Sequence, residues 1–132
     1  MIGLDTNVLV RYLTQDDPLQ ARRANAVVAS ALEKGERCRL EGVVLCELVW
    51  VLRGAYGYDK ATVVDTLERV LATAQFEIGD KDLARRALED HRVGSGDFAD
   101  YLIGHANREA GCASTVTFDR RLKSSAVFRV LR

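Results

Sequence analysis

The sequence contains few of the features that would assign it directly to a particular class of protein. It contains one proline, three cysteines and equal numbers of basic and acidic residues, 19 of each. No apolar run approaches the roughly 20 residues that a membrane-spanning helix needs. The N-terminus also lacks the basic region, apolar core and cleavage site of a secretory signal. We therefore expect a protein of the cytoplasm.

The cysteines, Cys38, Cys46 and Cys112, are an odd number at wide spacing. They form no CxxC pair and no disulfide framework. Neither histidine, His91 or His105, has a cysteine at the spacing of a zinc site. We interpret the cysteines as small buried thiols in a reducing compartment, and we do not expect a zinc site.

The formal net charge is zero, which argues against a protein that coats nucleic acid passively. It does not exclude a nuclease, which concentrates acids where metal ions lie and bases where phosphates lie. Residues 120–132 carry five basic residues and no acid. The charge is therefore distributed unevenly although the total cancels.

The chain of 132 residues is 48% hydrophobic and 29% charged, which fits one compact domain over residues 1–132. Short apolar runs alternate with segments of helical periodicity, which is typical of an α/β fold. We expect a three-layer fold, with a parallel sheet of about four to five strands and helices on both faces. Strands are predicted at residues 1–4, 37–40, 76–78, 113–117 and 128–131. Helices are predicted at 7–13, 18–34, 42–53, after Asp59, at 80–91 and 98–110, with Asp17, Asp59 and Asp80 as caps.

Two aspartates directly follow predicted strands. Asp5 comes after the first strand, and Asp119 comes after the strand that ends at Thr117. Ligands of open parallel sheets bind at the carboxyl ends of the strands, so this placement favours a functional role. The alternative is local: Asp5 would cap the helix that begins at Asn7, and Asp119 would be a turn or cap residue before Arg120.

Three more acids stand where an acid is costly. Glu47 lies in a helix that is apolar on most faces, and a buried charge must be paired or bound to metal. The alternatives are a narrow exposed stripe or an ion pair with Arg53. Asp97 and Asp100 share one face at the start of a helix, where like charges repel unless a cation lies between them. The alternative is a capping Asp97 and an exposed Asp100.

Carboxylate oxygens with retained waters are the ligands that Mg²⁺ or Mn²⁺ prefers. Two such ions about 3.5–4 Å apart can stabilise the attacking and leaving oxygens of a phosphodiester. No GxSxG, P-loop or GxGxxG motif competes with this interpretation, and Gly94-Ser95-Gly96 reads as a flexible turn. The candidate catalytic and metal-binding residues are Asp5, Glu47, Asp97, Asp100 and Asp119.

Four segments, in order, resemble the motifs of one family. The opening IGLDTNVL at 2–9 resembles the start of PIN domains, and Glu47 in its apolar helix resembles their second acidic motif. DFADYLIG at 97–104 resembles the third motif, and VTFD at 116–119 resembles the fourth. Their order and the chain length resemble VapC-type toxins of bacterial and archaeal toxin–antitoxin pairs, from end to end of the chain.

The resemblance implies a PIN-like fold and cleavage of RNA by a water that Mg²⁺ or Mn²⁺ activates. It implies that Asp5, Glu47, Asp100 and Asp119 are an acidic quartet, with Asp97 as a fifth acid. Two polar residues match positions that help to hold the site, namely Asn7 and Thr117. The resemblance also implies a homodimer and a cognate VapB-like antitoxin whose peptide blocks the site.

Two basic residues, Arg120 and Arg121, directly follow Asp119 and are candidate contacts for RNA phosphates, with solvated surface bases as the alternative. Two other functions remain open. A non-catalytic PIN-like binding module would be favoured by a missing acid, and none is missing. A phosphotransfer domain of the HAD or receiver type would need a DxD or a paired acid at the first strand, which Asp5-Thr6-Asn7 does not provide.

Overall fold

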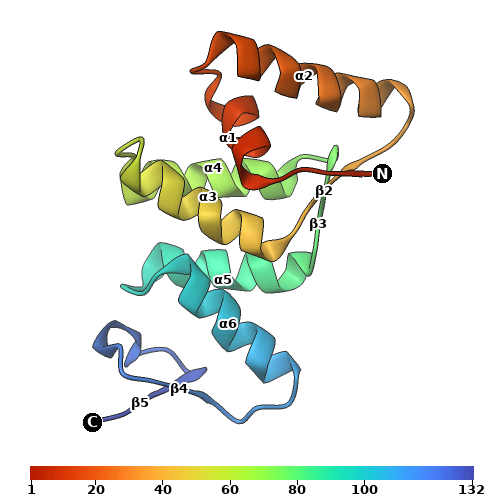
Figure 1. The fold of residues 1–132 in the computed structure, drawn as a ribbon. Helices are drawn as coiled ribbons and strands as arrows, with labels where there is room; N and C mark the ends of the chain where they lie inside the picture. Colours follow the sequence, from red (N-terminus) through yellow and green to blue (C-terminus); the bar gives the residue numbers. More distant parts are fainter.

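The computed structural model describes residues 1–132, in which six helices and five short strands follow one another (Figure 1). The elements in order are β1 (Ile2–Gly3), α1 (Thr6–Thr14), α2 (Pro18–Glu33), β2 (Cys38–Leu40), α3 (Gly42–Gly54), α4 (Lys60–Ala72), β3 (Phe76–Ile78), α5 (Lys81–Val93), α6 (Phe98–Glu109), β4 (Thr115–Thr117), the 3-10 turn η1 (Arg120–Leu122) and β5 (Phe128–Val130). Every predicted strand and helix is present, and the ends differ by a few residues at most.

Aspartates begin several of the helices. Asp17 caps α2 through the backbone N–H of Gln20, and Asp59 caps α4 through Thr62, so both predicted caps are confirmed. The cap predicted at Asp80 is wrong. That residue precedes α5 with a left-handed backbone, φ 51°, and its side chain makes no capping bond. A capping side chain normally needs an extended backbone to reach the free N–H groups.

All the strands pair in parallel, as predicted, but they form two sheets rather than one sheet of four to five strands. The first has the order β1-β2-β3, with Ile2 opposite Cys38 and Cys38 opposite Phe76. The second contains only β4 and β5. The second sheet packs on α6, where the Asn107 amide donates to Thr115 Oγ1 at 3.0 Å, across the contact between helix and strand.

The two faces of the three-stranded sheet differ in polarity. Cys38, Leu40 and Phe76 are buried on one face. The other face carries Arg39 and Glu77, which form an ion pair at 3.5 Å. This second face is thus more polar than the first, and its opposite charges pair with each other.

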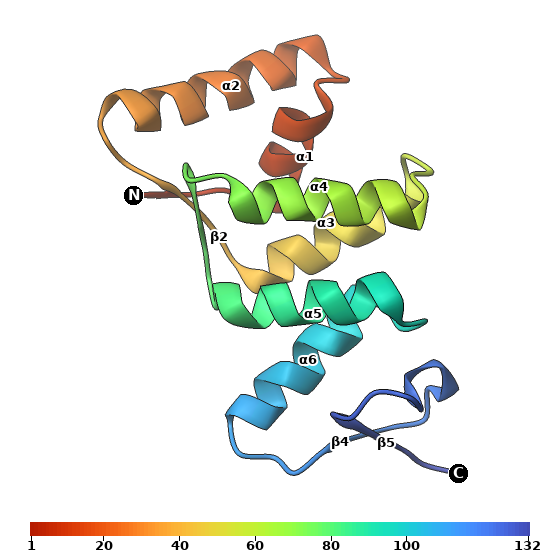
Figure 2. The same ribbon diagram turned by 180° about the vertical axis from the view of Figure 1, so that it is seen from behind.

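Helix α3 runs through the middle of the helical layer and contacts α1, α4 and α6 (Figures 1 and 2). Leu45, Leu48 and Leu52 are fully buried in it. One narrow stripe of the same helix faces solvent and contains Val43, Glu47 and Trp50. These positions lie on one side because the helix repeats about every 3.6 residues. The stripe carries the first of the residues that matter for function.

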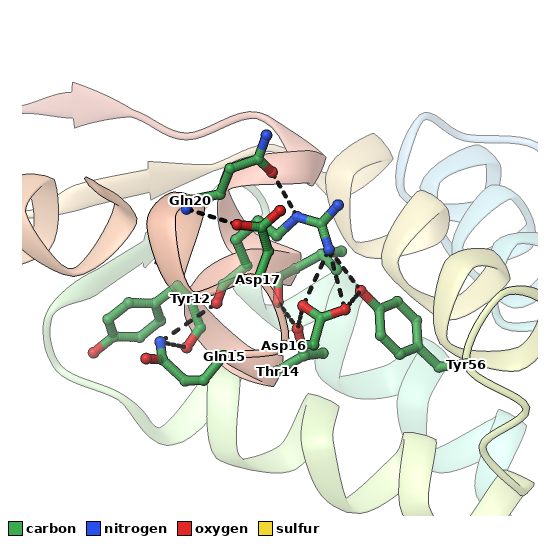
Figure 3. A network of polar contacts seen from close by, with 9 residues as sticks. Tyr12, Thr14, Gln15, Asp16, Asp17, Gln20 and Tyr56 are labelled. Carbon is green, nitrogen blue, oxygen red and sulfur yellow. Dashed lines mark hydrogen bonds and ion pairs between the residues drawn. The ribbon is translucent and has the colours of Figure 1, made fainter. Parts of the chain in front are cut away.

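A polar network ties the end of α1 to the loop between α3 and α4 (Figure 3). Asp16 accepts hydrogen bonds from Tyr56 Oη and Thr14 Oγ1, both at 2.7 Å, and from Arg11 at 3.0 Å. The bonds from Tyr56 and Thr14, together with that from Arg11, hold the pKa of Asp16 well below its usual value. The network fixes α1 relative to α3.

The cysteines only partly match the expectation of buried thiols. Cys38 and Cys46 are buried, and burial raises the pKa of the Cys46 thiol to about 11. Cys112 is exposed, because it follows Gly111 in the turn after α6 and packs against no core element. None of the helices has the length and apolar character that crossing a bilayer would require.

The packing of the second sheet against α6 can be tested at Gly104. A Cβ at this position would lie 2.7 Å from the Phe128 ring and 2.9 Å from Val127. Gly104→Ala should therefore cost about 1–3 kcal/mol of stability in urea unfolding, the usual penalty of overpacking. Gly54→Ala is the control, since nothing lies within 4 Å of its Cβ. Equal stability of the two variants would contradict this packing.

Candidate active site

Asp5 lies two residues beyond β1 and begins helix α1. Its Oδ1 accepts the Val8 N–H at 3.1 Å, and the side chain is exposed. The local alternative, a helix cap, is thus realised. The cap uses only one oxygen of the carboxylate, because Oδ2 accepts no hydrogen bond from the chain. Asp5 therefore has one oxygen held by the helix and one free for a ligand.

Glu47 is not buried, contrary to expectation. It lies on the exposed stripe of α3, which was one of the two alternatives, while Arg53 donates instead to the Tyr58 carbonyl. Thr6 Oγ1 donates to Glu47 Oε1 at 3.0 Å, across 41 positions of sequence. Since Thr6 directly follows Asp5, this bond places Glu47 beside the end of β1. The contribution of Thr6 had no signal in the sequence.

Asp97 precedes α6 but makes no capping bond with its side chain. Its Oδ2 accepts instead from the indole Nε1 of Trp50 at 2.8 Å. Trp50 stands one helical turn after Glu47 on the same stripe, so α3 contacts the first turn of α6 through its polar edge. Trp50 was not expected to hold an acid, because an aromatic residue in an apolar helix usually belongs to the core.

The turn at Gly94-Ser95-Gly96, expected to be flexible, is closely packed. The Gly96 N–H donates to Tyr101 Oη at 3.0 Å, and the Gly96 carbonyl lies 2.9 Å from His91 Nδ1. A Cβ at Gly96 would clash with Leu122. Burial lowers the pKa of His91, which favours the neutral ring. The turn therefore holds the backbone immediately before Asp97 in place.

The five candidate acids lie in a row that begins at Asp5, and Asp100 and Asp119 form its other end. Burial raises the pKa of Asp100, and the charges of Asp97 and Asp119 raise it further, against the attraction of Arg121. Asp119 pairs with Arg121 at 2.6 Å, and hydrogen bonds from that arginine lower the pKa of the carboxylate. The Asp119 N–H donates to Thr117 Oγ1 at 3.1 Å, which makes Thr117 a support for this strand end.

The remaining sequence candidates lie at the borders of the row. Asn7 and Asp5 line a cleft of about 320 Å³ between α1 and α2, together with Arg11 and Arg23. Arg120 is exposed and makes no ion pair. The two arginines of the cleft were not expected here, since each lies on a helix surface with no motif around it.

The acids follow a path along α1, α3, α6 and η1, but they do not close into a cluster. The donor chemistry suits a hard divalent cation, because all five groups are carboxylates. Yet no three Asp, Glu, His or Cys side chains of the chain lie close enough together to hold a metal ion. The expected gathering of all these acids around cations is therefore not formed within one chain, and one of them, Asp119, is neutralised by Arg121 instead.

Residues 2–127 match the family described as "PIN domain". The chain belongs to the PIN domain family. A curated relative, the VapC ribonuclease of Aquifex aeolicus (strain VF5), is 26% identical over 120 residues, which make up 91% of this chain and 88% of that protein. No solved structure matches the chain. The α/β PIN-like fold expected from the sequence is thus confirmed.

The opposite surroundings of two acids in this PIN domain give opposite effects on stability. The raised pKa of Asp100 means that its ionisation destabilises the fold as pH rises above the ordinary value of 3.8. Asp100→Asn should therefore raise Tm at pH 7. The lowered pKa of Asp119 means that its ionised form stabilises the fold above pH 3.8, so Asp119→Asn should lower Tm at pH 7.

The Asp100 difference should shrink as the pH falls towards 3.8 and be absent below it, because the folded form of this carboxyl takes up its proton above that pH. The Asp119 difference should persist down to pH 3.8 and shrink only below it, because the folded form of this carboxyl keeps its charge to lower pH. Thermal melting in EDTA over this pH range measures them without a metal contribution. Shifts of the same sign for the two variants at pH 7 would contradict the assigned surroundings.

Proposed function

We propose that the chain is a Mg²⁺- or Mn²⁺-dependent endoribonuclease and the toxin of a toxin–antitoxin pair. The observation that carries the proposal is the row of acids from Asp5 to Asp119, contributed by four separate elements of a PIN domain. The similarity to a protein named VapC ribonuclease over 91% of the chain supports RNA as the substrate. The proposal requires the acids to come closer together than they are in the isolated chain.

The residues divide into ligands and supports. Asp5, Glu47, Asp97, Asp100 and Asp119 are the proposed ligands. A divalent ion held by them would supply an activated water and would neutralise charge on the phosphate. Thr6 holds Glu47 and Trp50 holds Asp97, so each acid keeps a defined orientation.

In this proposal, basic side chains around the row of acids contact the phosphates of the RNA backbone. Arg120 is free of ion pairs and is the stronger candidate for a phosphate contact, because Arg121 is already held by Asp119. A planar guanidinium can pair with two phosphate oxygens at once. Arg23, in the cleft beside Asp5 and Asn7, extends the basic border on the other side.

We further propose a homodimer and a cognate VapB-like antitoxin as partners. An antitoxin peptide that blocks the acids would do so most simply with an arginine, which matches carboxylate geometry. Apolar residues of the peptide would pack beside it, because an exposed ion pair alone is screened by salt. Trp50 is 53% exposed next to Asp97 and offers such a contact.

The central test uses Asp5→Asn and Asp100→Asn. Each should lower cleavage of a stem-loop RNA with Mg²⁺ by more than about 100-fold, because each removes a charge that binds metal. EDTA should abolish wild-type cleavage, and Mg²⁺ or Mn²⁺ should restore it. Asp59→Asn is the matched control, since Asp59 caps α4 and takes no part in the row.

Full activity of both variants would overturn the assignment of these acids. A wild-type chain that binds the RNA without cutting it under any of these metals would favour the alternative of a non-catalytic binding module.

A further inference from the structure

Trp50 is the only tryptophan of the chain, and it lies in solvent rather than in the core. It is 53% exposed, which is unusual, because tryptophan is highly buried on average in folded proteins. Trp50 follows Glu47 by three residues on the exposed stripe of α3. The buried leucines on the other side of the helix already hold α3 in the fold. The ring is therefore not needed for the core.

The indole of Trp50 has a fixed orientation. Its one hydrogen-bonding group, the Nε1–H, donates to Asp97 Oδ2 at 2.8 Å. This bond holds the far edge of the ring, while the buried helix α3 holds its near end. The surface that remains in solvent consists of ring carbon atoms. A rigid aromatic surface of this kind loses little conformational entropy when it binds a partner.

No other ring of the chain packs against Trp50. Tyr12 packs edge-on against Phe76, and Tyr56 packs edge-on against Tyr58, each with ring centroids 5.9 Å apart. Such separations are those at which aromatic rings attract one another. The face of Trp50 lacks an aromatic neighbour of this kind and is available to a ring from outside the chain.

The charges around Trp50 limit what that outside ring can be. Glu47 precedes it on α3, and Asp97 lies at the edge of the indole. Each of these carboxylates accepts a hydrogen bond at only one of its two oxygens. An isolated phosphate would be repelled here, because like charges at short range repel. An uncharged aromatic ring would not be repelled, and a nucleobase is such a ring.

We propose that Trp50 is the platform on which one base of the RNA stacks. The inference rests on the proposed function, because it takes RNA as the substrate. Residues three apart on a helix have their Cβ atoms about 5–6 Å apart, so the sugar and phosphate of the stacked nucleotide lie beside Glu47. Trp50 thereby positions the substrate at the acids. Every base has a π face, so the platform accepts any base that is free of its own neighbours.

Fluorescence of the wild-type chain tests the stacking without reference to cleavage. The emission reports this one ring, because Trp50 is the only tryptophan. In Mg²⁺, the chain is titrated with a single-stranded oligouridylate and with an abasic ribose–phosphate strand of equal length. A base stacked on an indole quenches its fluorescence, so the oligouridylate should quench and the abasic strand should not. Cleavage would not hide the effect, since the products keep their bases.

Three other results are decisive in this titration. Equal quenching by both strands would overturn the proposal, because the backbone charge alone would then explain it. Cleavage of the RNA without quenching would also overturn it and would leave the proposed function standing. RNA that is neither bound nor cut would count against the proposed function, and the inference would fail with it.

Two variants separate the ring from its N–H group. Trp50→Phe keeps a flat ring and loses the bond to Asp97, whereas Trp50→Gln keeps an N–H donor and loses the ring. We expect kcat/KM for RNA cleavage to stay close to wild type in Trp50→Phe. It should fall by about 5- to 150-fold in Trp50→Gln, the usual effect of losing one stacked base. Leu32→Gln is the matched control, since Leu32 is 65% exposed on α2, and it should not change cleavage.

An equal loss in Trp50→Phe and Trp50→Gln would assign Trp50 the role of orienting Asp97 and would overturn the platform. Wild-type activity of Trp50→Gln would also overturn it, and contact with a protein partner would remain as the use of the exposed ring. Far-UV circular dichroism identical to wild type shows that each variant is folded.

Single abasic substitutions along a cleaved RNA locate the stacked base. At one position near the cut, loss of the base should lower wild-type kcat/KM by the same factor as Trp50→Gln does. The two losses should not add when this RNA is given to the Trp50→Gln chain, because both remove the same contact. Losses that add at every position would show that the ring and the bases act separately, and would overturn the proposal.

Discussion

Burial of helix α3 is the constraint on which the rest of the structure depends. Its leucines at 45, 48 and 52 are fully enclosed, and α1, α4 and α6 pack around them. Enclosing a large apolar side chain contributes about 1.5–3 kcal/mol, so these contacts fix the helix firmly. This fixes the rotation of α3 about its axis, and with it the direction in which its single exposed stripe points. Glu47 and Trp50 on that stripe reach α1 and α6 as a direct result.

Electrostatics explains why the acids stay apart in one chain. Carboxylates brought together without a cation repel. The pKa of Asp100 is raised mainly by burial, and the charges of Asp97 and Asp119 add to that effect. The fold relieves the repulsion in two ways. Asp119 turns to Arg121, and Asp97 accepts from an uncharged indole rather than facing its neighbour alone. A cation or a partner must outweigh these contacts to draw the row together.

The strands divide into two sheets, and Asp119 follows the first strand of the second sheet. Strands of two or three residues bury little on their own and depend on what packs against them. The sheet of β4 and β5 found its support on α6, where the absence of a side chain at Gly104 admits the Phe128 ring. The other edge of β4, beside Asp119 at its end, pairs with no strand of the chain.

The sequence by itself determined the elements, their parallel pairing and the family. Helix starts at Asp17 and Asp59 follow from local hydrogen bonding, which depends only on neighbouring residues. The acids at the ends of strands could be identified in the same way, because their positions relative to apolar runs are written in the chain. Asp80 shows where such local prediction fails, since its residue type did not predict its left-handed backbone.

Only the tertiary structure decided how the strands divide and what surrounds each acid. Glu47 was expected to be buried because its neighbours are apolar, but helix rotation relative to α1 and α6 determines which stripe meets solvent. Thr6 and Trp50 became supports through contacts across 41 and 47 positions, and such long-range partners depend on packing rather than on local pattern. The open edges of β1 and β4 arose for the same reason: pairing is settled by which surfaces meet, and the sequence of one strand does not name its neighbour.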